Sequence, residues 1–289
     1  MKRDRIKFMA LALAAILIPA VSFAQSKIFS KKENLKDMGE KTLMVILNNN
    51  SLVNLTIKDA VNSNWDLSKV EFGNMEDFNK AKTDTSYYFL IRTDGQFKKE
   101  NDPGIEFLSL LKGGPDAIMG IANMYDVLSL PLQSIDDGSG YILPFIETYI
   151  KIMKTHVQRI QESKIAATIG ISWYSNRLSK IGKRNIFINE NDLSDFTTAE
   201  FVNSKFKERG KVTDEDTIEE ALEKRLSGIL VSLCIAPQKP QNGGSYCYKM
   251  LVGADDGELY YYRKQKISDK KPKGFLPEDI NKISIPFIF

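Results

Sequence analysis

The sequence predicts an α/β (α+β) fold made of two tandem, related modules joined by a long helix. Three observations lead to this prediction. Strand patterns alternate with helix patterns, the order of these patterns occurs twice, and an amphipathic helical stretch separates the two occurrences. The expected domains are a signal peptide at 1–24, a first module at 25–135, a linker with the long helix at 136–165, and a second module at 166–289.

An internal repeat is the most informative feature of the chain. LKDMGEKTLMV (35–45) aligns with LSKIGKRNIFI (178–188) at an offset of 143 residues, and further along the offset becomes 141. A near-constant offset over so many residues favours an internal duplication. The positions aligned at the second offset are Val61 with Val202, Trp65 with Phe206, Tyr88 with Ile229, Phe89 with Leu230, Phe107 with Tyr248, and Leu111 with Val252.

Each module is expected to run strand, helix, strand, helix and hairpin. Alternating apolar residues predict the strands, apolar residues one helical turn apart predict the first helix, and an acidic start with Thr213 or Asp214 as N-cap predicts the second helix of the second module. The first module comprises TLMVIL (42–47), NLTIKDAVNSNW (54–65), KVEF (69–72), a second helix, and the hairpin of SYYFLIR (86–92) with GIEFLSLLK (104–112). The second comprises NIFIN (185–189), TTAEFVNSKF (197–206), GKVT (210–213), DEDTIEEALEKRL (214–226), and the hairpin of GILVSLCI (228–235) with SYCYKMLV (245–252).

The connection between the modules contains PDAIMGIANMYDVLSL (115–130), a polar stretch and a helix over about 141–163. In that helix Ile146, Tyr149, Met153 and Ile160 form a stripe at helical spacing, which is typical of core packing. The chain's only histidine, His156, lies in register with this stripe, so it is expected to be a core residue.

The first 24 residues have the pattern of a secretory signal peptide. A basic start is followed by the apolar run FMALALAAILIPAVSF and by small residues before Gln25, which is the expected mature N-terminus. A membrane anchor is the alternative, but the run is short for a span and contains Pro19. We therefore expect a secreted or periplasmic protein with no transmembrane span in the mature chain.

Charge argues against a nucleic-acid partner. The chain has 40 basic and 37 acidic residues, and removing residues 1–24 leaves 36 of each. A nucleic-acid-binding protein would show a basic excess.

Motifs for familiar chemistry are missing from the sequence. One histidine and two cysteines are too few for a structural zinc site, and no serine lies in a G-x-S-x-G motif. KGGPD (112–116) lacks the Lys-Ser/Thr of a phosphate-binding loop and favours a turn before a helix. No cofactor is expected. A carboxylate pair could still converge from residues distant in the sequence.

The stretch GADDGELYYY (253–262) crowds carboxylates around Gly257 just before three tyrosines. The acids end at Glu258, short of the ligand spacing of a calcium loop, so a turn between strands is favoured. Tyrosines on the two neighbouring strands are candidates for stacking on a sugar or contacting a partner, with aromatic packing between the strands as the alternative. They are Tyr246, Tyr248, Tyr260, Tyr261 and Tyr262.

The two cysteines are candidates for a disulfide. A simple register of the second hairpin places Cys234 directly opposite Cys247, with Val231 opposite Met250 on the other, apolar face. Cβ atoms of directly opposed residues lie about 4.5–5.5 Å apart. Export would supply an oxidising compartment, in which paired cysteines are commonly bridged. Two buried free thiols are the alternative.

Together these features predict an exported, non-enzymatic binding or interaction protein of a bacterial cell envelope. The expected partner is another envelope protein or a glycan, and the expected place of contact is the cleft between the modules. A carboxylate-dependent hydrolase and a structural or assembly protein are the alternatives. The ligand and the oligomeric state are left open by the sequence.

Overall fold

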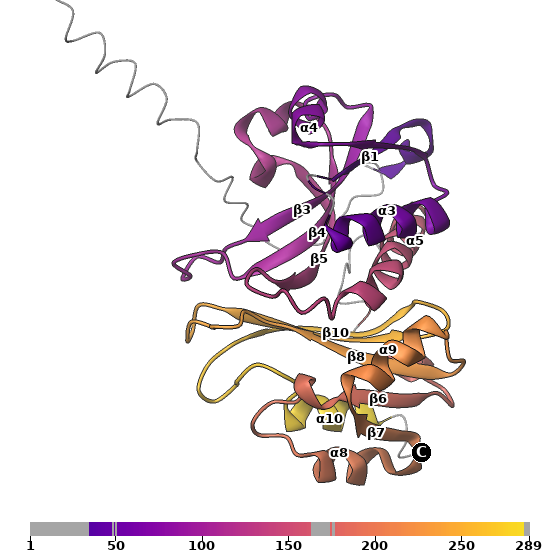
Figure 1. Ribbon diagram of the computed structural model, residues 1–289, viewed down its shortest axis with the longest axis vertical. Helices are drawn as coiled ribbons and strands as arrows, with labels where there is room; N and C mark the ends of the chain where they lie inside the picture. The colour runs from indigo at the N-terminus through magenta and orange to yellow at the C-terminus, as the bar shows by residue number, and fades with distance from the viewer. Residues whose placement is uncertain (1–34, 48, 50, 163–173, 175–176, 286–289) are drawn as a thin grey trace, which may run out of the picture.

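The computed structural model describes residues 35–47, 49, 51–162, 174 and 177–285 (Figure 1). The expected signal peptide, 1–24, and Gln25 lie outside the described residues. The fold is mixed α/β, with six α-helices and two five-stranded sheets in the described part of the chain. None of the described helices has the length and apolar character needed to cross a bilayer.

Sheet 1 belongs to the first module and has the strand order β2-β1-β3-β4-β5. Strand β1 is parallel to both β2 and β3, whereas β4 is antiparallel to both β3 and β5. The strands are β1 (Thr42–Ile46), β2 (Lys69–Gly73), β3 (Tyr87–Gly95), β4 (Ile105–Lys112) and β5 (Tyr125–Ser134). Helix α3 (Leu52–Asn64) connects β1 to β2, α4 (Met75–Ala81) connects β2 to β3, and the 3-10 turns η2 (Pro115–Met119) and η3 (Ile121–Asn123) precede β5.

Sheet 2 belongs to the second module and has the order β10-β9-β8-β6-β7. Read from the other edge it is β7-β6-β8-β9-β10, so in both sheets the order is second, first, third, fourth and fifth strand of the module. The strands are β6 (Asn185–Asn189), β7 (Gly210–Thr213), β8 (Ile229–Ile235), β9 (Tyr246–Gly253) and β10 (Leu259–Lys266). The helices are α8 (Ala199–Phe206), α9 (Glu215–Glu223) and α10 (Pro277–Ser284). Shorter 3-10 turns are η1 (Met38–Glu40), η4 (Leu143–Phe145), η5 (Arg177–Lys180), η6 (Glu190–Asp192) and η7 (Lys207–Arg209).

Polar residues begin the helices where the sequence has capping signals. Ser51 caps α3, Thr198 caps α8, and Asp214, rather than Thr213, caps α9 by accepting a hydrogen bond from Thr217 N at 2.9 Å. Helix α4 has a full capping box between Asn74 and Asp77. These caps satisfy free amides of the first turn and fix where each helix starts.

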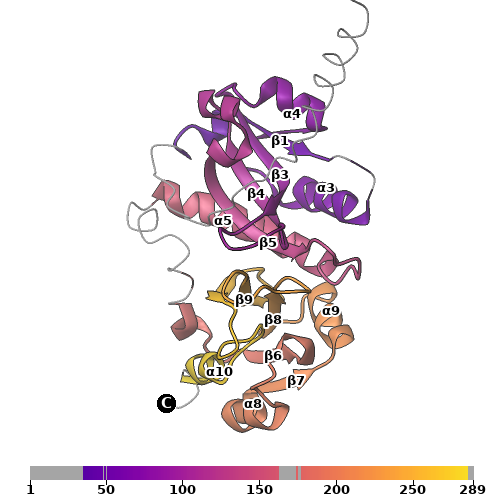
Figure 2. The ribbon, with the colours of Figure 1, turned by 90° about the vertical axis from the view of Figure 1, so that its left-hand side faces the viewer.

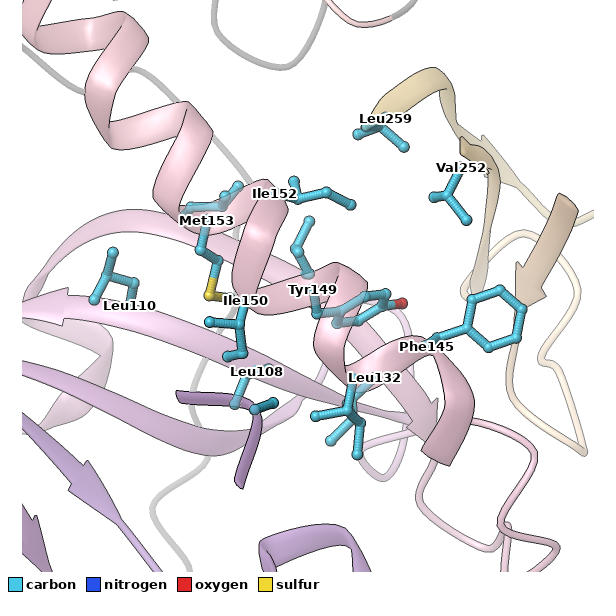
Figure 3. Close-up of a cluster of buried hydrophobic side chains, with 14 of the residues drawn as sticks. Leu108, Leu110, Leu132, Phe145, Tyr149, Ile150, Ile152, Met153, Val252 and Leu259 are labelled. Carbon is cyan, nitrogen blue, oxygen red and sulfur yellow. The ribbon is translucent and has the colours of Figure 1, made fainter. Parts of the chain in front are cut away.

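Helix α5 (Ile146–Glu162) lies between the two sheets (Figure 3). All four residues of the predicted stripe are at most 1% exposed, so the prediction of a core stripe is confirmed. Phe145, Tyr149 and Ile150 share one hydrophobic cluster with side chains of both sheets, among them Leu108 of sheet 1 and Val252 of sheet 2. One core therefore joins the modules.

Sheet 2 has an inner and an outer face. Its inner face, with Val231, Leu233, Met250 and Val252, belongs to the core shared with sheet 1 and α5. Its outer face packs against α8 and α10 through a separate cluster that includes Phe206, Leu230 and Ile280. In Figures 1 and 2 this face, with α8 and α10, lies at the end of the molecule away from the first module.

Two details differ from the sequence predictions. Residues 125–134, expected to be part of a connection, form β5 and pair with β4. The β8–β9 register is shifted by two residues, so that Val231 lies opposite Val252 and Cys234 lies opposite Lys249, not Cys247. A two-residue shift leaves every side chain on its predicted face, which is why the apolar pattern could not detect it.

The predicted turn at GADDGELYYY is present. The chain turns at residues 254–256, Gly257 has a φ of 64°, and its N–H donates to Gly253 O at 3.0 Å. His156 is 3% exposed and its Nδ1 is 3.2 Å from the Tyr174 hydroxyl. Burial lowers its pKa to about 4, as expected for a neutral core histidine.

Candidate functional site

An acidic pocket lies at the junction, which we define as the region where linker residues 136–145 and the first module meet the second. Its volume is about 180 Å³. Residues from the linker and from helix α9, which are far apart in the sequence, form its wall: Ser139, Gly140, Tyr141, Leu143, Pro144, Phe145, Glu215 and Glu219. The linker bends into the pocket at Gly140, where φ is 82° and a side chain would be strained.

Two carboxylates dominate the electrostatics of this pocket. Glu215 and Glu219 are one turn apart on α9, so both side chains lie on the same face of the helix. Burial raises the pKa of Glu215, and the negative charges of Glu219, Asp216 and Asp137 raise it further. The pocket therefore favours a group that brings positive charge or hydrogen-bond donors.

The aromatic side of the pocket is fixed by packing. Tyr141 and Phe145 meet edge to face, with ring centroids 5.5 Å apart. The Tyr141 hydroxyl accepts a hydrogen bond from Asn189 Nδ2 at 2.8 Å, at the end of β6. Desolvation raises the pKa of Tyr141 far above its ordinary value, so the hydroxyl stays protonated. Tyr141 thus attaches the linker to the second module.

Two loops interlock beside the linker. Pro237 of the β8–β9 loop packs so closely on Gly104 that a Cβ there would lie 2.8 Å from Pro237 Cγ. Gly244 approaches the backbone of Lys99 equally closely. Asn101 N donates to Gln241 Oε1 at 3.3 Å. These contacts align the β8–β9 loop with the β3–β4 loop.

Four of the five candidate tyrosines are buried. Tyr248, Tyr260, Tyr261 and Tyr262 are at most 4% exposed, so their rings face core neighbours and offer little surface for a sugar. A bulge between Leu259 and Tyr261 breaks the alternation of β10 and turns both Tyr260 and Tyr261 to the outer face.

The fifth tyrosine, Tyr246, is partly exposed and lies at the junction. Its ring centroid is 4.6 Å from that of Phe97 in the first module. Lys264 Nζ lies 4.4 Å from the Phe97 ring centroid and 4.5 Å from that of Tyr246. Burial lowers the pKa of Lys264 to about 8. The rings of Tyr246 and Phe97 therefore already contact a cation of the same chain, Lys264.

Two of the three carboxylates of GADDGELYYY are bound by arginines, and the third, Asp255, accepts from Gly228 N at 3.0 Å. Glu258 receives hydrogen bonds from Arg159 of α5, at 2.6 Å, and from Arg177 of η5. Asp256 accepts from Arg184 at 2.9 Å. The arginines hold the pKa of Glu258 below its usual range despite its burial. Glu258 fastens the turn to α5, Asp256 fastens it to Arg184, and both of these carboxylates are already paired.

A buried polar network lies under the outer face of sheet 2. Lys249 and Asp279 are both 0% exposed and form an ion pair, and Asp279 also accepts from Tyr261 and Arg263. Nearby, Asp192 accepts from Ser232 Oγ at 2.6 Å and from Cys234 N at 2.9 Å. Desolvation raises the pKa of Asp192 to about 7. Among the described residues no group of three or more His, Cys, Asp or Glu is arranged to hold a metal ion.

Sequence reasoning missed both the pocket and this network. Glu215 and Glu219 look like an ordinary acidic helix start, and only the bend of the linker places them beside Tyr141. Lys249 interrupts an apolar strand, which was the one available signal of a buried charge. Comparison with protein-family models, with curated proteins and with solved structures finds no match to this chain.

Proposed function

We propose that this chain is an exported, non-enzymatic binding protein of a bacterial cell envelope whose ligand contacts the acidic pocket at the junction. The observation that carries the proposal is the wall of the pocket, in which the linker meets helix α9 with two carboxylates beside an aromatic pair. An ammonium or guanidinium group complements such a site. We expect that group to come from a basic side chain of an envelope protein or from an amino sugar of a glycan.

We also infer that the two modules arose by duplication. The equal strand order of the two sheets supports this inference. In each sheet, the first and last helices of the module (α3 and α5, α8 and α10) also pack on the same face. Leu43 pairs with Tyr88 in sheet 1, and Ile186, aligned with Leu43, pairs with Leu230 in sheet 2. Tyr88 then corresponds to Leu230 at an offset of 142, one residue from the sequence alignment. Further support comes from buried apolar residues near the C-terminal ends of α3 and α8, where Val61 and the C-cap Trp65 resemble Val202 and Phe206.

A carboxylate-dependent hydrolase is the alternative that a specific observation favours. Glu215 has a raised pKa and lines the pocket with a second carboxylate, Glu219, as an acid–base pair would. Against it, the pocket is small for a chain of sugars. An assembly role draws support from Ile118 and Met119, which are adjacent on η2 and each 73% exposed.

The binding proposal is tested with ligands that differ only in charge. Glucosamine oligosaccharides with free amines, and a short lysine-containing peptide, are expected to bind, whereas the same oligosaccharides after N-acetylation are not. Titration calorimetry at low and high salt measures this difference, because screening weakens a charge contact at a partly open pocket. Equal binding of the acetylated and free oligosaccharides would contradict a cationic ligand.

Variants locate the contact. Glu215→Gln with Glu219→Gln removes both charges from the pocket and is expected to abolish binding of the amine. Glu223→Gln is the matched control, because Glu223 lies on the same helix, is exposed and does not line the pocket. New reducing ends formed from the oligosaccharides by the wild type, and lost in the double variant, would favour the hydrolase instead.

Export is tested separately. Expression of the full chain in a bacterium followed by N-terminal sequencing of the secreted or periplasmic protein should give Gln25 as the first residue. Recovery of residues 1–24 on the exported protein would contradict cleavage.

A further inference from the structure

The chain's two cysteines lie at the two ends of the β8–β9 loop, which we call its roots, one in β8 and one in β9. Cys234 is the second-last residue of β8 and Cys247 the second residue of β9. Cys234 lies opposite Lys249, so Cys247 is its diagonal neighbour across the hairpin. In this structure both are thiols, Cys247 buried and Cys234 partly exposed. A hydrogen bond between the two thiols and burial raise the pKa of Cys234, and the same bond lowers that of Cys247.

Sheet 1 has a tie at the corresponding diagonal. Arg92 lies opposite Leu108 on β4, and its diagonal neighbour Glu106 accepts two hydrogen bonds from the guanidinium, each of 2.7 Å. The hairpins of the two modules are therefore held at the same place in different ways. Where the first has a bidentate ion pair, the second has two thiols in contact.

The loop between the cysteines is the one that interlocks with the first module. Twelve residues, 235–246, separate the thiols. Besides the contacts of Pro237 and Gly244, Gln238 N donates to Ser134 Oγ at 3.1 Å and Gln238 Nε2 donates to Asp136 O at 3.1 Å. Anything that fixes the roots of this loop also fixes the position of the second module on the first.

We propose that Cys234 and Cys247 are a cross-strand disulfide site whose closure clamps the β8–β9 loop onto the first module. The partly exposed Cys234 loses its proton to water, and its thiolate attacks an external disulfide, which forms a mixed disulfide and releases one thiolate that takes up a proton. The Cys247 thiolate then attacks the Cys234 sulfur and releases the second thiol. Two electrons and two protons pass from the cysteines to the external disulfide, which is the oxidant.

Closure also moves the strands. Diagonal neighbours lie about 7–8 Å apart, with their Cβ atoms somewhat closer, whereas a disulfide needs Cβ atoms about 3.5–4.5 Å apart. The bond therefore draws the end of β8 toward the start of β9 and shortens the span that the loop bridges. Because the loop is closed at both roots, fewer open conformations remain to it, and its contacts with the 96–104 loop persist for longer.

The site is tested on purified chain lacking residues 1–24, so the result does not depend on export. The reduced protein is incubated with oxidised glutathione, denatured, and treated with a maleimide before mass spectrometry. We expect no reactive thiol and a mass about 2 Da lower than that of the reduced chain. Two reactive thiols, or only glutathione adducts, would overturn the disulfide.

The clamp is tested by hydrogen exchange. Amides of 236–245 and of 96–104 are expected to exchange at least about tenfold more slowly in the oxidised than in the reduced protein. The turn at 254–256 serves as an internal control and should not change. Cys234→Ser with Cys247→Ser should show the reduced rate with or without oxidant. Equal rates in the oxidised and reduced protein would overturn the clamp even if the disulfide forms.

Discussion

Sheets 1 and 2 share a strand order but differ in the helix that covers their last three strands. Helix α5 covers sheet 1 with apolar residues such as Tyr149 and Met153, both 0% exposed. Helix α10 covers sheet 2 with eight residues and brings Asp279 onto Lys249. At the corresponding position of β4, sheet 1 has Leu108, also 0% exposed.

The difference shows what a short helix needs in order to hold its place. Helix α5 has 17 residues and contacts both sheets, so burial of apolar area is sufficient to position it. Helix α10 buries less apolar surface, and its position depends on a carboxylate with several donors. Asp279 accepts from Lys249, Tyr261, Arg263 and Leu276 N. A fully satisfied buried charge of this kind specifies one geometry.

The largest expected effect comes from breaking this network. Asp279→Asn removes the negative charge and leaves Lys249 buried without its ion pair, which should destabilise the protein by about 3–5 kcal/mol. Urea unfolding followed by circular dichroism measures the change. Lys249→Leu with Asp279→Leu, which makes sheet 2 resemble sheet 1, should cost less than the sum of the two single replacements. Simple additivity would show that Lys249 and Asp279 do not act as a pair.

Local signals predicted local structure well. Asp214 as a cap, the stripe on α5 and the turn at Gly257 each depend on residues close in sequence, and each was found. The Lys249–Asp279 pair joins a strand to a helix 30 residues away, and the pocket joins the linker to α9. Such contacts depend on the tertiary arrangement, which produces no repeating pattern of residues in the sequence. Which tyrosines are buried also depends on such contacts, because a bulge in β10 and the neighbouring module determine which faces are covered.

A second comparison concerns two buried carboxyls, one in each module. Desolvation raises the pKa of both Asp126 and Asp192 to about 7. Asp192 accepts two hydrogen bonds, whereas Asp126 accepts one from Ser129, and its Oδ1 has no partner among the described residues. Asp126 therefore carries the less compensated charge.

Asp126→Asn should accordingly stabilise the protein at high pH. The pKa of Asp126 is about 7 in the folded protein and about 3.9 in the unfolded chain. Its neutral form is therefore fully compatible with folding below about pH 4, and stability is lost as the pH rises toward about 7 and the buried carboxyl ionises. The gain from the variant should be absent near pH 4 and reach on the order of 3 kcal/mol near pH 8. Asp192→Asn should gain less, because an amide has one acceptor oxygen and would lose one of the two hydrogen bonds that Asp192 accepts. Unfolding free energies across this pH range decide the matter, and a gain independent of pH would contradict burial of the charge.

A smaller effect is expected where the two modules interlock. In Gly244→Ala the new Cβ would lie 2.8 Å from Lys99 O, so the loops must move apart. Overpacking of this kind costs about 1–3 kcal/mol. Gly138→Ala is the control, since nothing lies within 4 Å of its added Cβ. Thermal unfolding of both variants measures the loss of stability. Equal melting temperatures would show that the two loops can move apart without loss of stability.

The smallest expected effects compare the second helices of the modules. Asn74 begins α4 by accepting from Glu76 N and Asp77 N, and its own N–H donates to Asp77 Oδ2. Asp214 begins α9 by accepting from Thr217 N, and this bond lowers its pKa. Asn74→Ala should cost about 0.5–2 kcal/mol at any pH, because the amide does not titrate. The contribution of Asp214 should instead be lost as the pH falls from about 5 to about 3, because only its carboxylate favours the capped helix. Denaturant midpoints of Asn74→Ala and Asp214→Ala at both pH values test this, and a deficit of Asp214→Ala that persists at the lower pH would mean that its charge contributes nothing to the cap.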